Sequence, residues 1–436
     1  MREQLGRNSR NSHLPPSSDP PGRKNTSKRE KGKRKRGGQP GRLGRKRELL
    51  PPEQVDEFVD FYPDHCEKCR EPLPKIPGPA PWRFQVTELP ACKPHTTEYR
   101  RHEVKCACGH RTCAAYHADA IPSSPFGPRL MGTIAMLTGV YHLSRRNVKD
   151  LLNEICGVQI SLGALSTLEG RVAEALEPAV REAWMKIEEH AVKHTDGTTW
   201  LQTGVVLALW TIATAFVTVF KIVTDGRKET LKPLYGELKG ILVSDRATAL
   251  NFWAMERRQV CWAHLLRKFV SFAERDGPAG ALGQELLGYT GILFEYWHDY
   301  KDGNLGAEQF RAWMTPLREQ VERVLQRGVA ANIERVSGSC ADILEHRAAL
   351  WTFVEHDGVE PTNNHAEREL RAFVLWRKRS FGTQSERGNR FAERVMTVAH
   401  TARKQGRNVL EFLTAACKAK LDETPSPSLF ALELAA

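Results

Sequence analysis

The chain has 436 residues, 41% of them hydrophobic, and a formal net charge of +12. It is long enough for two or three domains with a sizeable core. Its polar start lacks the apolar stretch of a signal peptide. The one long apolar run, 205–223, contains threonines and a lysine, which favours strands over a membrane span. We therefore expect a cytoplasmic, nucleoid-associated protein with no membrane partner.

The charge is concentrated in the first segment of the chain. Residues 1–48 hold 16 Lys or Arg and 4 Asp or Glu, so the other residues are neutral overall. This segment is rich in Pro, Gly and Ser and poor in apolar residues, which predicts a disordered basic arm. Such an arm suits a polyanion, above all nucleic acid; a solvated tail without a partner is the alternative. The predicted DNA contacts in the arm are Arg34, Lys35, Arg36 and Arg42.

Residues 49–120 form a cysteine-rich, proline-punctuated segment that predicts a small zinc-binding module. Cysteines of a cytosolic protein are thiols or metal ligands rather than disulfides. Two short-spaced pairs can supply the four ligands of a tetrahedral Zn²⁺. The predicted structural Zn²⁺ ligands are Cys66, Cys69, Cys106 and Cys108. Residues that can replace one of them are Cys92, His110 and Cys113. Reduced cysteines in a small core are the alternative without metal.

Residues 121–190 read as helices. Val148, Leu152 and Ile155 lie on one face of a helix that Ser144 caps and Gly157 ends. A second helix begins near residue 161, so the pair resembles a helix-turn-helix. Because many helix pairs never contact DNA, base reading by this one is left open.

From residue 191 strands come first and helices follow, which indicates a mixed α/β catalytic domain over 191–405. The predicted strands are 192–195, a hairpin or two long strands over 205–223, and 240–244. The predicted helical stretches are 262–350 and 364–405, and residues 406–436 are assigned to a C-terminal tail.

Three carboxylates stand at the predicted element ends. Asp196 and Asp245 each follow a short apolar strand, and Glu367 opens a helix. Aspartates on adjacent strands can converge with a helical glutamate to bind Mg²⁺. A pair of such ions supports phosphodiester chemistry. Singly, each aspartate is more often a helix cap or turn residue.

Several motifs together resemble the transposases of the insertion sequence 66 family, of the DDE class with a ribonuclease-H-like catalytic fold. The motifs are the Asn/Ser-rich start at 8–12 with 15–19, Gly-Gly-Gln-Pro-Gly at 37–41, the cysteine module, 194–196, 244–245, 261–269, 363–368, 377–382 and 401–406. The family's usual aspartate before the two asparagines is replaced here by Thr362. Relatives usually begin with a coiled-coil segment, whereas this sequence starts inside or after it.

The resemblance implies cleavage of DNA at element ends and transfer of the 3′-hydroxyl into target DNA. It assigns Asp196, Asp245 and Glu367 as ligands of Mg²⁺ or Mn²⁺. Glu367 follows Asp245 by 122 residues, which leaves room for a helical insertion at about 265–350.

The resemblance also draws attention to residues around these carboxylates. Cys261 and His264 resemble a Cys/Asp-x-x-His motif that follows the second aspartate in several DDE families, although a packed cysteine with a satisfied histidine fits equally well. The basic residues near Glu367 are candidate phosphate contacts, with a solvated face as the alternative. They are Arg368, Arg371, Arg377, Lys378 and Arg379.

Three functions are consistent with these patterns. The first is a transposase acting on element ends and target DNA, with a homo-oligomer on DNA and accessory proteins of the same element as partners. The second is a catalytically inactive relative that binds DNA ends. The third is a ribonuclease-H-like nuclease on RNA–DNA hybrids. The presence of all three carboxylates favours an enzyme over the inactive relative.

Overall fold

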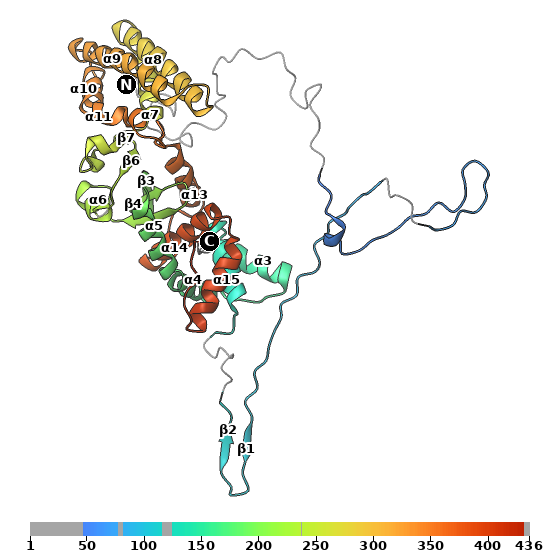
Figure 1. Ribbon diagram of the computed structural model, residues 1–436. Coiled ribbons are helices and arrows are strands. Elements are labelled where there is room, and N and C mark those ends of the chain that lie inside the picture. Colours follow the sequence, from blue (N-terminus) through green and yellow to red (C-terminus); the bar gives the residue numbers. More distant parts are fainter. Residues whose placement is uncertain (1–46, 77–81, 116–123, 237, 431–436) are drawn as a thin grey trace. The chain divides into compact units, whose positions relative to one another are not determined.

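The computed structural model describes residues 47–76, 82–115, 124–236 and 238–430 (Figure 1). The chain divides into two compact units. One is Gly22–Lys93, and the other combines Met1–Pro21 with Pro94–Ala436. The predicted DNA contacts of the basic arm, Arg34, Lys35, Arg36 and Arg42, lie outside the described residues.

The described part of the smaller unit is mostly irregular. It contains one short 3-10 helix, η2 (Pro52–Gln54), and an isolated bridge between His65 and Pro72. Cys66 opens a tight turn there. Its N–H donates to the Glu71 carbonyl, and its own carbonyl accepts from Arg70 N–H, both at 2.9 Å. The turn brings Cys69 back towards Cys66.

The first two strands of the larger unit, β1 (Glu103–Lys105) and β2 (Arg111–Cys113), form an exposed hairpin. Its turn contains Cys106 and Cys108. Cys106 N–H donates to the His110 carbonyl at 2.7 Å, and the Cys106 carbonyl accepts from Gly109 N–H at 2.8 Å. Each cysteine pair therefore occupies a hydrogen-bonded turn of its own.

A five-stranded mixed sheet forms the centre of the larger unit, in the order β5-β4-β3-β6-β7. β3, β4 and β5 pair antiparallel, whereas β3, β6 and β7 pair parallel. The strands are β3 (Val192–Gln202), β4 (Val205–Ala213), β5 (Thr218–Val223), β6 (Ile241–Ser244) and β7 (Arg258–Val260). The apolar run 205–223 is thus confirmed as two strands.

The position of Asp196 corrects one expectation. The sequence analysis ended the first strand at residue 195, whereas β3 continues to Gln202 and Asp196 lies within it. The strand continues because residues 197–202 pair with residues 205–210 of β4. Trp200, within this paired segment, is fully buried. Polar residues at 198 and 199 hid this extension.

The helices before the sheet begin where side-chain caps predict. Ser144 Oγ accepts from Asn147 N–H and Ser161 Oγ from Ala164 N–H, both at 3.1 Å, while Gly157 takes a φ of 68° at the end of α3. These helices are α2 (Pro128–Ala135), the π-helix η3 (Met136–Val140), α3 (Arg145–Cys156), α4 (Leu162–Ala175) and α5 (Glu177–Glu189).

One hydrophobic core joins these helices to the sheet and to the last two helices, α14 (Glu386–Lys404) and α15 (Val409–Leu421). α15 lies within the segment 406–436 that the sequence analysis took as a tail. Leu413 and Cys417 of α15 are fully buried, and Gly132 of α2 lies so close that a Cβ there would meet Leu413 at 3.2 Å.

A second hydrophobic core gathers the helices between β7 and residue 355, and α8 and α9 lie side by side in it (Figure 1). Trp262 is fully buried there and donates through Nε1 to the Leu350 carbonyl at 2.7 Å. These helices are α7 (Trp262–Ala273), α8 (Pro278–Lys301), α9 (Ala307–Ala330), α10 (Ser337–Glu345), α11 (Arg347–Leu350) and α12 (Thr352–Glu355), while α6 (Lys228–Tyr235) connects β5 to β6. Among the described residues, no helix is long and apolar enough to cross a membrane.

Helix α13 (Asn364–Ser380) lies on β3, and the segment after it is fastened to the end of that strand. Thr383 N–H donates to the Leu201 carbonyl, and Thr203 N–H donates to the Thr383 carbonyl, both at 2.9 Å. Gly382 makes this approach possible. Its φ is 86°, and a Cβ there would lie 2.0 Å from the Leu201 oxygen.

We expect Gly382→Ala to lower the free energy of unfolding by more than about 1 kcal/mol, because the methyl group meets a backbone oxygen at an unfavourable φ. Urea unfolding measures the change. Gly291→Ala in α8 is the matched control, since a Cβ there meets nothing within 4 Å. The control should be neutral or slightly stabilising. Equal loss in both variants would contradict the close approach.

Candidate metal-binding site

The register of β3 and β6 places two of the predicted carboxylates beside each other. His194 pairs with Val243 in the parallel ladder, so Asp196 and Asp245 each stand two residues further on. Side chains two residues apart on a strand share a face, which puts both aspartates on the same face of the sheet. Asp245 follows the last residue of β6, as predicted.

Glu367 reaches the same region from the first turn of α13, also as predicted. The residue before this helix, Asn363, is fully buried and donates through Nδ2 to the Thr195 carbonyl at 2.7 Å. That hydrogen bond holds the start of α13 against Thr195, the residue that precedes Asp196 on β3. Three carboxylates distant in sequence thus come from three neighbouring elements.

These carboxylates affect one another's ionisation. Burial, together with the charges of Asp245 and Glu367, raises the pKa of Asp196 to about 8, although a hydrogen bond from Gly197 N–H opposes the rise. Burial also raises the pKa of Glu367; Arg267 opposes this rise and Asp245 adds to it. A half-buried site that disfavours three negative charges fits a divalent cation, which restores the ionised forms.

Cys261 and His264 lie directly beside Glu367. His264 Nδ1 is 3.6 Å from Glu367 Oε1, and one potential ligand atom from each of the three residues lies within 4.8 Å of the others. Arg267 Nη2 is 3.5 Å from the same oxygen. Glu367 therefore faces α7 in this structure, and the two aspartates do not belong to that tight group.

Cys261 joins the two helices that meet here. Its Sγ accepts from Asn363 N–H at 3.1 Å, and burial raises the pKa of the thiol to about 11. The side chain is therefore a neutral thiol at physiological pH. This contact holds the first turns of α7 and α13 together and supports an auxiliary role for Cys261.

The sequence matches a model of a known protein family. The model of the transposase IS66 family matches residues 123–391, which is more than half of the chain. This protein belongs to the IS66 transposase family. A second model, a family of unknown function (DUF6444), matches residues 1–48. No curated protein matches the chain.

Arg258 is a further residue of the site in this IS66 family member, and the sequence analysis missed it. It is fully buried on β7 and donates to Ser244 Oγ at 3.1 Å, to the Asp245 carbonyl at 2.8 Å and to Asn251 Oδ1 at 2.8 Å. Burial lowers its pKa to about 10. Arg258 thus fixes the backbone that carries Asp245. A single arginine at the start of the three-residue strand 258–260 gave no indication in the sequence that it holds the Asp245 backbone.

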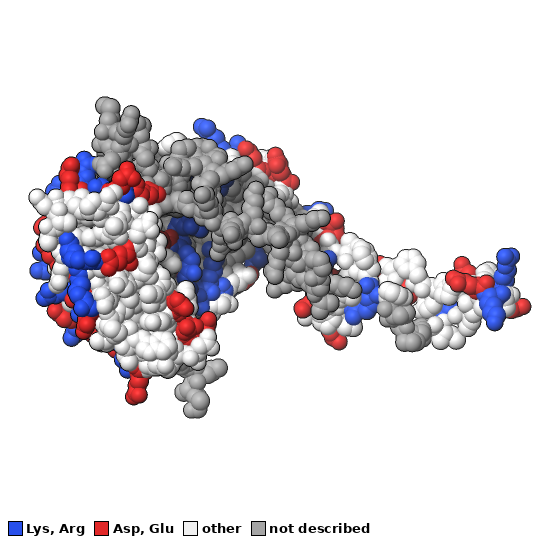
Figure 2. Space-filling view, turned by 90° about the horizontal axis from the view of Figure 1, so that it is seen from above, with Lys and Arg blue, Asp and Glu red and all other residues white. Residues whose placement is uncertain are grey.

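The basic residues of α13 differ in their surroundings. Arg377 is half-buried and donates to Thr198 Oγ1 at 3.2 Å and to Thr199, so it ties α13 to β3; burial lowers its pKa. The exposed members are Arg368, Arg371, Lys378 and Arg379. Figure 2 shows Lys and Arg side chains gathered in a hollow of the folded unit, with mixed charges around it.

A buried polar cluster holds the other side of α13 against α14. Glu369 accepts a short hydrogen bond from His400 and forms an ion pair with Lys404 at 3.0 Å. Lys404 also donates to the Thr214 carbonyl at 2.6 Å. Burial would raise the pKa of Glu369, but the His400 hydrogen bond and the charge of Lys404 outweigh it and lower that pKa to about 2.

Because the folded pKa of Glu369 lies below its ordinary value of 4.5, its ionised form stabilises the fold above that value. This contribution is lost as pH falls from about 4.5 towards 2. We expect Glu369→Gln to lower stability at pH 7 by roughly 2 kcal/mol and to flatten the pH dependence of unfolding in that window.

Thermal unfolding between pH 7 and pH 2.5 tests this expectation. Glu411→Gln is the matched control, because Glu411 forms an exposed ion pair with Arg129 and should change little. If the two variants follow the same pH curve, the buried cluster does not carry the effect.

Proposed function

We propose that this IS66 family transposase cleaves the ends of its DNA element and joins the freed 3′-hydroxyl to target DNA by two-metal phosphoryl transfer. Asp196, Asp245 and Glu367 hold the two Mg²⁺ or Mn²⁺ ions. The observation that carries the proposal is the level placement of Asp196 and Asp245 on adjacent parallel strands, beside the helix turn of Glu367.

The strand order supports a ribonuclease-H-like catalytic domain. A central first strand, β3, has an antiparallel hairpin pair on one side and two parallel strands on the other. The carboxylates stand on the first strand, after the fourth strand and on a later helix. In this domain α7 to α12 form the helical insertion, and their core also includes Ile241 and Val243 of β6 and Val260 of β7.

Two ions bound by these carboxylates would supply activation of the attacking oxygen and stabilisation of the leaving oxygen of a phosphodiester. The chain's own residues keep the site in place. Asn363 fixes the start of α13, and Arg258 fixes the end of β6. Both act on backbone carbonyls next to a carboxylate, so they limit how far the carboxylates can separate.

Arg267 and His264 hold Glu367 towards α7 in this structure. Rotation of the Glu367 side chain towards Asp245 completes the carboxylate set and releases the Arg267 guanidinium. A guanidinium freed beside the site is suited to a phosphate oxygen. We therefore assign His264 and Arg267 as positioning residues for Glu367, with Arg267 as a further candidate for contact with the DNA backbone.

DNA reaches this site along basic surfaces. The exposed Arg368, Arg371, Lys378 and Arg379 on α13 are proposed phosphate contacts, and the basic arm adds sequence-independent affinity. We propose that Arg377 contributes to the DNA surface from α13, where its hydrogen bonds to Thr198 and Thr199 hold the helix on β3. Assembly as a homo-oligomer on DNA and help from accessory proteins of the same element belong to this proposal.

We expect Mg²⁺- or Mn²⁺-dependent nicking of DNA that carries the element ends, and we expect Asp245→Asn to reduce its rate by at least about 100-fold. A gel assay on supercoiled end-containing plasmid measures this. Asp276→Asn, an exposed aspartate between α7 and α8, is the matched control with wild-type activity.

Equal nicking by the Asp245 and Asp276 variants would refute the carboxylate assignment. End binding without any nicking in the wild type would leave an inactive end-binding relative. Cleavage of RNA–DNA hybrids without end specificity would identify a ribonuclease-H-like nuclease.

A structural Zn²⁺ held by Cys66, Cys69, Cys106 and Cys108 is also part of the proposal. Backbone hydrogen bonds from Cys69 and Lys68 lower the pKa of Cys66, and hydrogen bonds from Cys108 lower the pKa of Cys106. Both effects favour the thiolates that bind zinc. The two pairs belong to different units, so their shared site rests on the sequence pattern.

We expect the purified full chain to contain one zinc per molecule and Cys69→Ser to lose it, because three ligands hold the ion less tightly than four. Elemental analysis after dialysis measures the content. Cys156→Ser in α3 is the control and should keep its zinc. Folded wild-type protein without zinc would overturn the assignment.

A further inference from the structure

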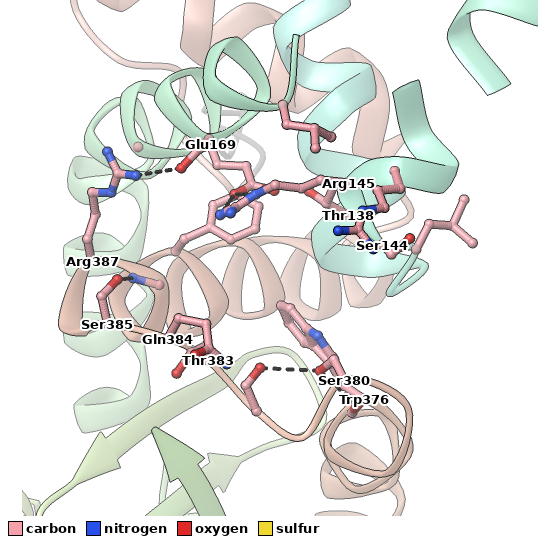
Figure 3. A pocket seen from close by; sticks show the side chains of 18 residues that line it. Thr138, Ser144, Arg145, Glu169, Trp376, Ser380, Thr383, Gln384, Ser385 and Arg387 are labelled. Carbon is pink, nitrogen blue, oxygen red and sulfur yellow. Dashed lines mark hydrogen bonds and ion pairs between the residues drawn. The ribbon is translucent and has the colours of Figure 1, made fainter. Parts of the chain in front are cut away.

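A pocket of about 850 Å³ opens in the larger unit among α3, α4 and the connection between α13 and α14. The labelled side chains approach the space between these elements from both sides (Figure 3). Among the described residues, neither the three carboxylates nor the predicted DNA contacts of α13 line it. The pocket is therefore separate from the site described above.

Its lining is positively charged. Three arginines face it, Arg145, Arg146 and Arg387, and Glu169 is the one acidic residue among its lining residues. Glu169 is 8% exposed and binds Arg145 at 2.5 Å, so its charge is neutralised by that partner. Arg146 and Arg387 are exposed and leave the pocket with a surplus of two positive charges.

Hydrogen-bond donors surround these charges. Arg387 Nη2 donates to Ser166 Oγ at 2.6 Å, which holds its side chain against α4. The exposed hydroxyls of Ser144, Ser380 and Ser385 line the pocket as well. Guanidinium groups among hydroxyls match the oxygens of a phosphodiester.

The pocket is rigidly connected to the candidate active site. Glu367 stands in the first turn of α13, and Ser380 ends that helix at the pocket. Thirteen residues of α-helix separate them, or about 20 Å. That length corresponds to about six nucleotides of a DNA strand. The Thr383 hydrogen bonds to Leu201 and Thr203 hold the pocket floor on β3.

The exposed cations of α13 lead from one site to the other. Arg371 follows Glu367 by four residues, and Lys378 follows Arg371 by seven, so these three share one helix face. A strand that leaves the carboxylates along this face passes Arg371 and Lys378 and reaches Arg387 and Arg146. A free anion would need no such continuous path.

We propose that this pocket binds the phosphate backbone of the transposase's DNA, about six nucleotides from the cleaved bond, through Arg146 and Arg387. The inference rests on the proposed function for the identity of the ligand. It adds an anchoring site that fixes where the strand lies relative to the carboxylates.

Fluorescence anisotropy with a labelled 30-base-pair duplex tests the proposal on the full chain, without divalent metal. Reversing both charges with Arg146→Glu and Arg387→Glu should weaken binding by about tenfold or more. The slope of log affinity against log salt should become shallower by about 1 for each lost phosphate contact. Arg387→Lys, with Arg146 unchanged, should retain most of the wild-type affinity for DNA.

Arg311→Glu is the matched control, because Arg311 is a half-exposed arginine of α9 outside the pocket. Unchanged affinity and salt slope in the double variant, relative to this control, would overturn the proposal. The proposal would also be overturned if the double variant bound inorganic phosphate more weakly than the wild type but bound DNA with wild-type affinity.

A second measurement locates the contact. In end-containing duplexes that carry single methylphosphonates, wild-type affinity should fall when the neutral linkage lies about six nucleotides from the cleavage site. The double variant should not respond to that linkage. The anisotropy assay needs no catalysis. A wild type that binds DNA through Arg146 and Arg387 but never nicks it would therefore sink the proposed function and leave phosphate binding by the pocket standing.

Discussion

The parallel pairing of β3 with β6 is the constraint on which the candidate site depends. It sets Asp196 level with Asp245, and a one-residue change of register would turn one of these side chains to the other face of the sheet. Other bonds then act on the carbonyls next to these aspartates. Asn363 binds the Thr195 carbonyl and thereby places α13, while Arg258 binds the Asp245 carbonyl. The site is thus built mainly from backbone contacts of the sheet.

This construction explains why several charged groups are buried around the site. Arg258 has no exposed surface, and its burial is compensated by four oxygen acceptors. Glu369 is compensated in the same way by His400 and Lys404 on the opposite side of α13. Asp196 differs, because its nearest charged neighbours include two further carboxylates and its pKa is raised. A site designed only for stability would not gather these charges, which is consistent with a role in binding cations.

Local signals in the sequence predicted local structure well. The caps Ser144 and Ser161 and the stop at Gly157 mark the helix pair, and the apolar run 205–223 forms two strands. Asp245 and Glu367 stand where their contexts predicted. The extent of β3 was missed because Gly197 and two consecutive threonines precede the buried Trp200, and only pairing with β4 keeps this segment extended.

Contacts between distant segments had no comparable signal. The partners of Glu369 lie 31 and 35 residues further along the chain, on another helix. Arg258 and Arg267 look like ordinary strand and helix cations in the sequence, and only the fold brings them to the carboxylates. The choice of three carboxylates among the many acidic residues came from the family resemblance rather than from single-sequence patterns.

The packing also shows that the folded core needs more than the matched segment. The family match ends at residue 391, within α14, yet the buried Thr397 and Thr401 beyond it hold β5 by hydrogen bonds to Phe220 N–H and Thr218 N–H. α15 then covers α2. Since α14 also carries His400 and Lys404, which fix α13, the residues after the match determine where Glu367 and the arginine-lined pocket lie. The two ends of α13 are therefore positioned by one continuous core, so a DNA strand held at one end is set in a defined position at the other.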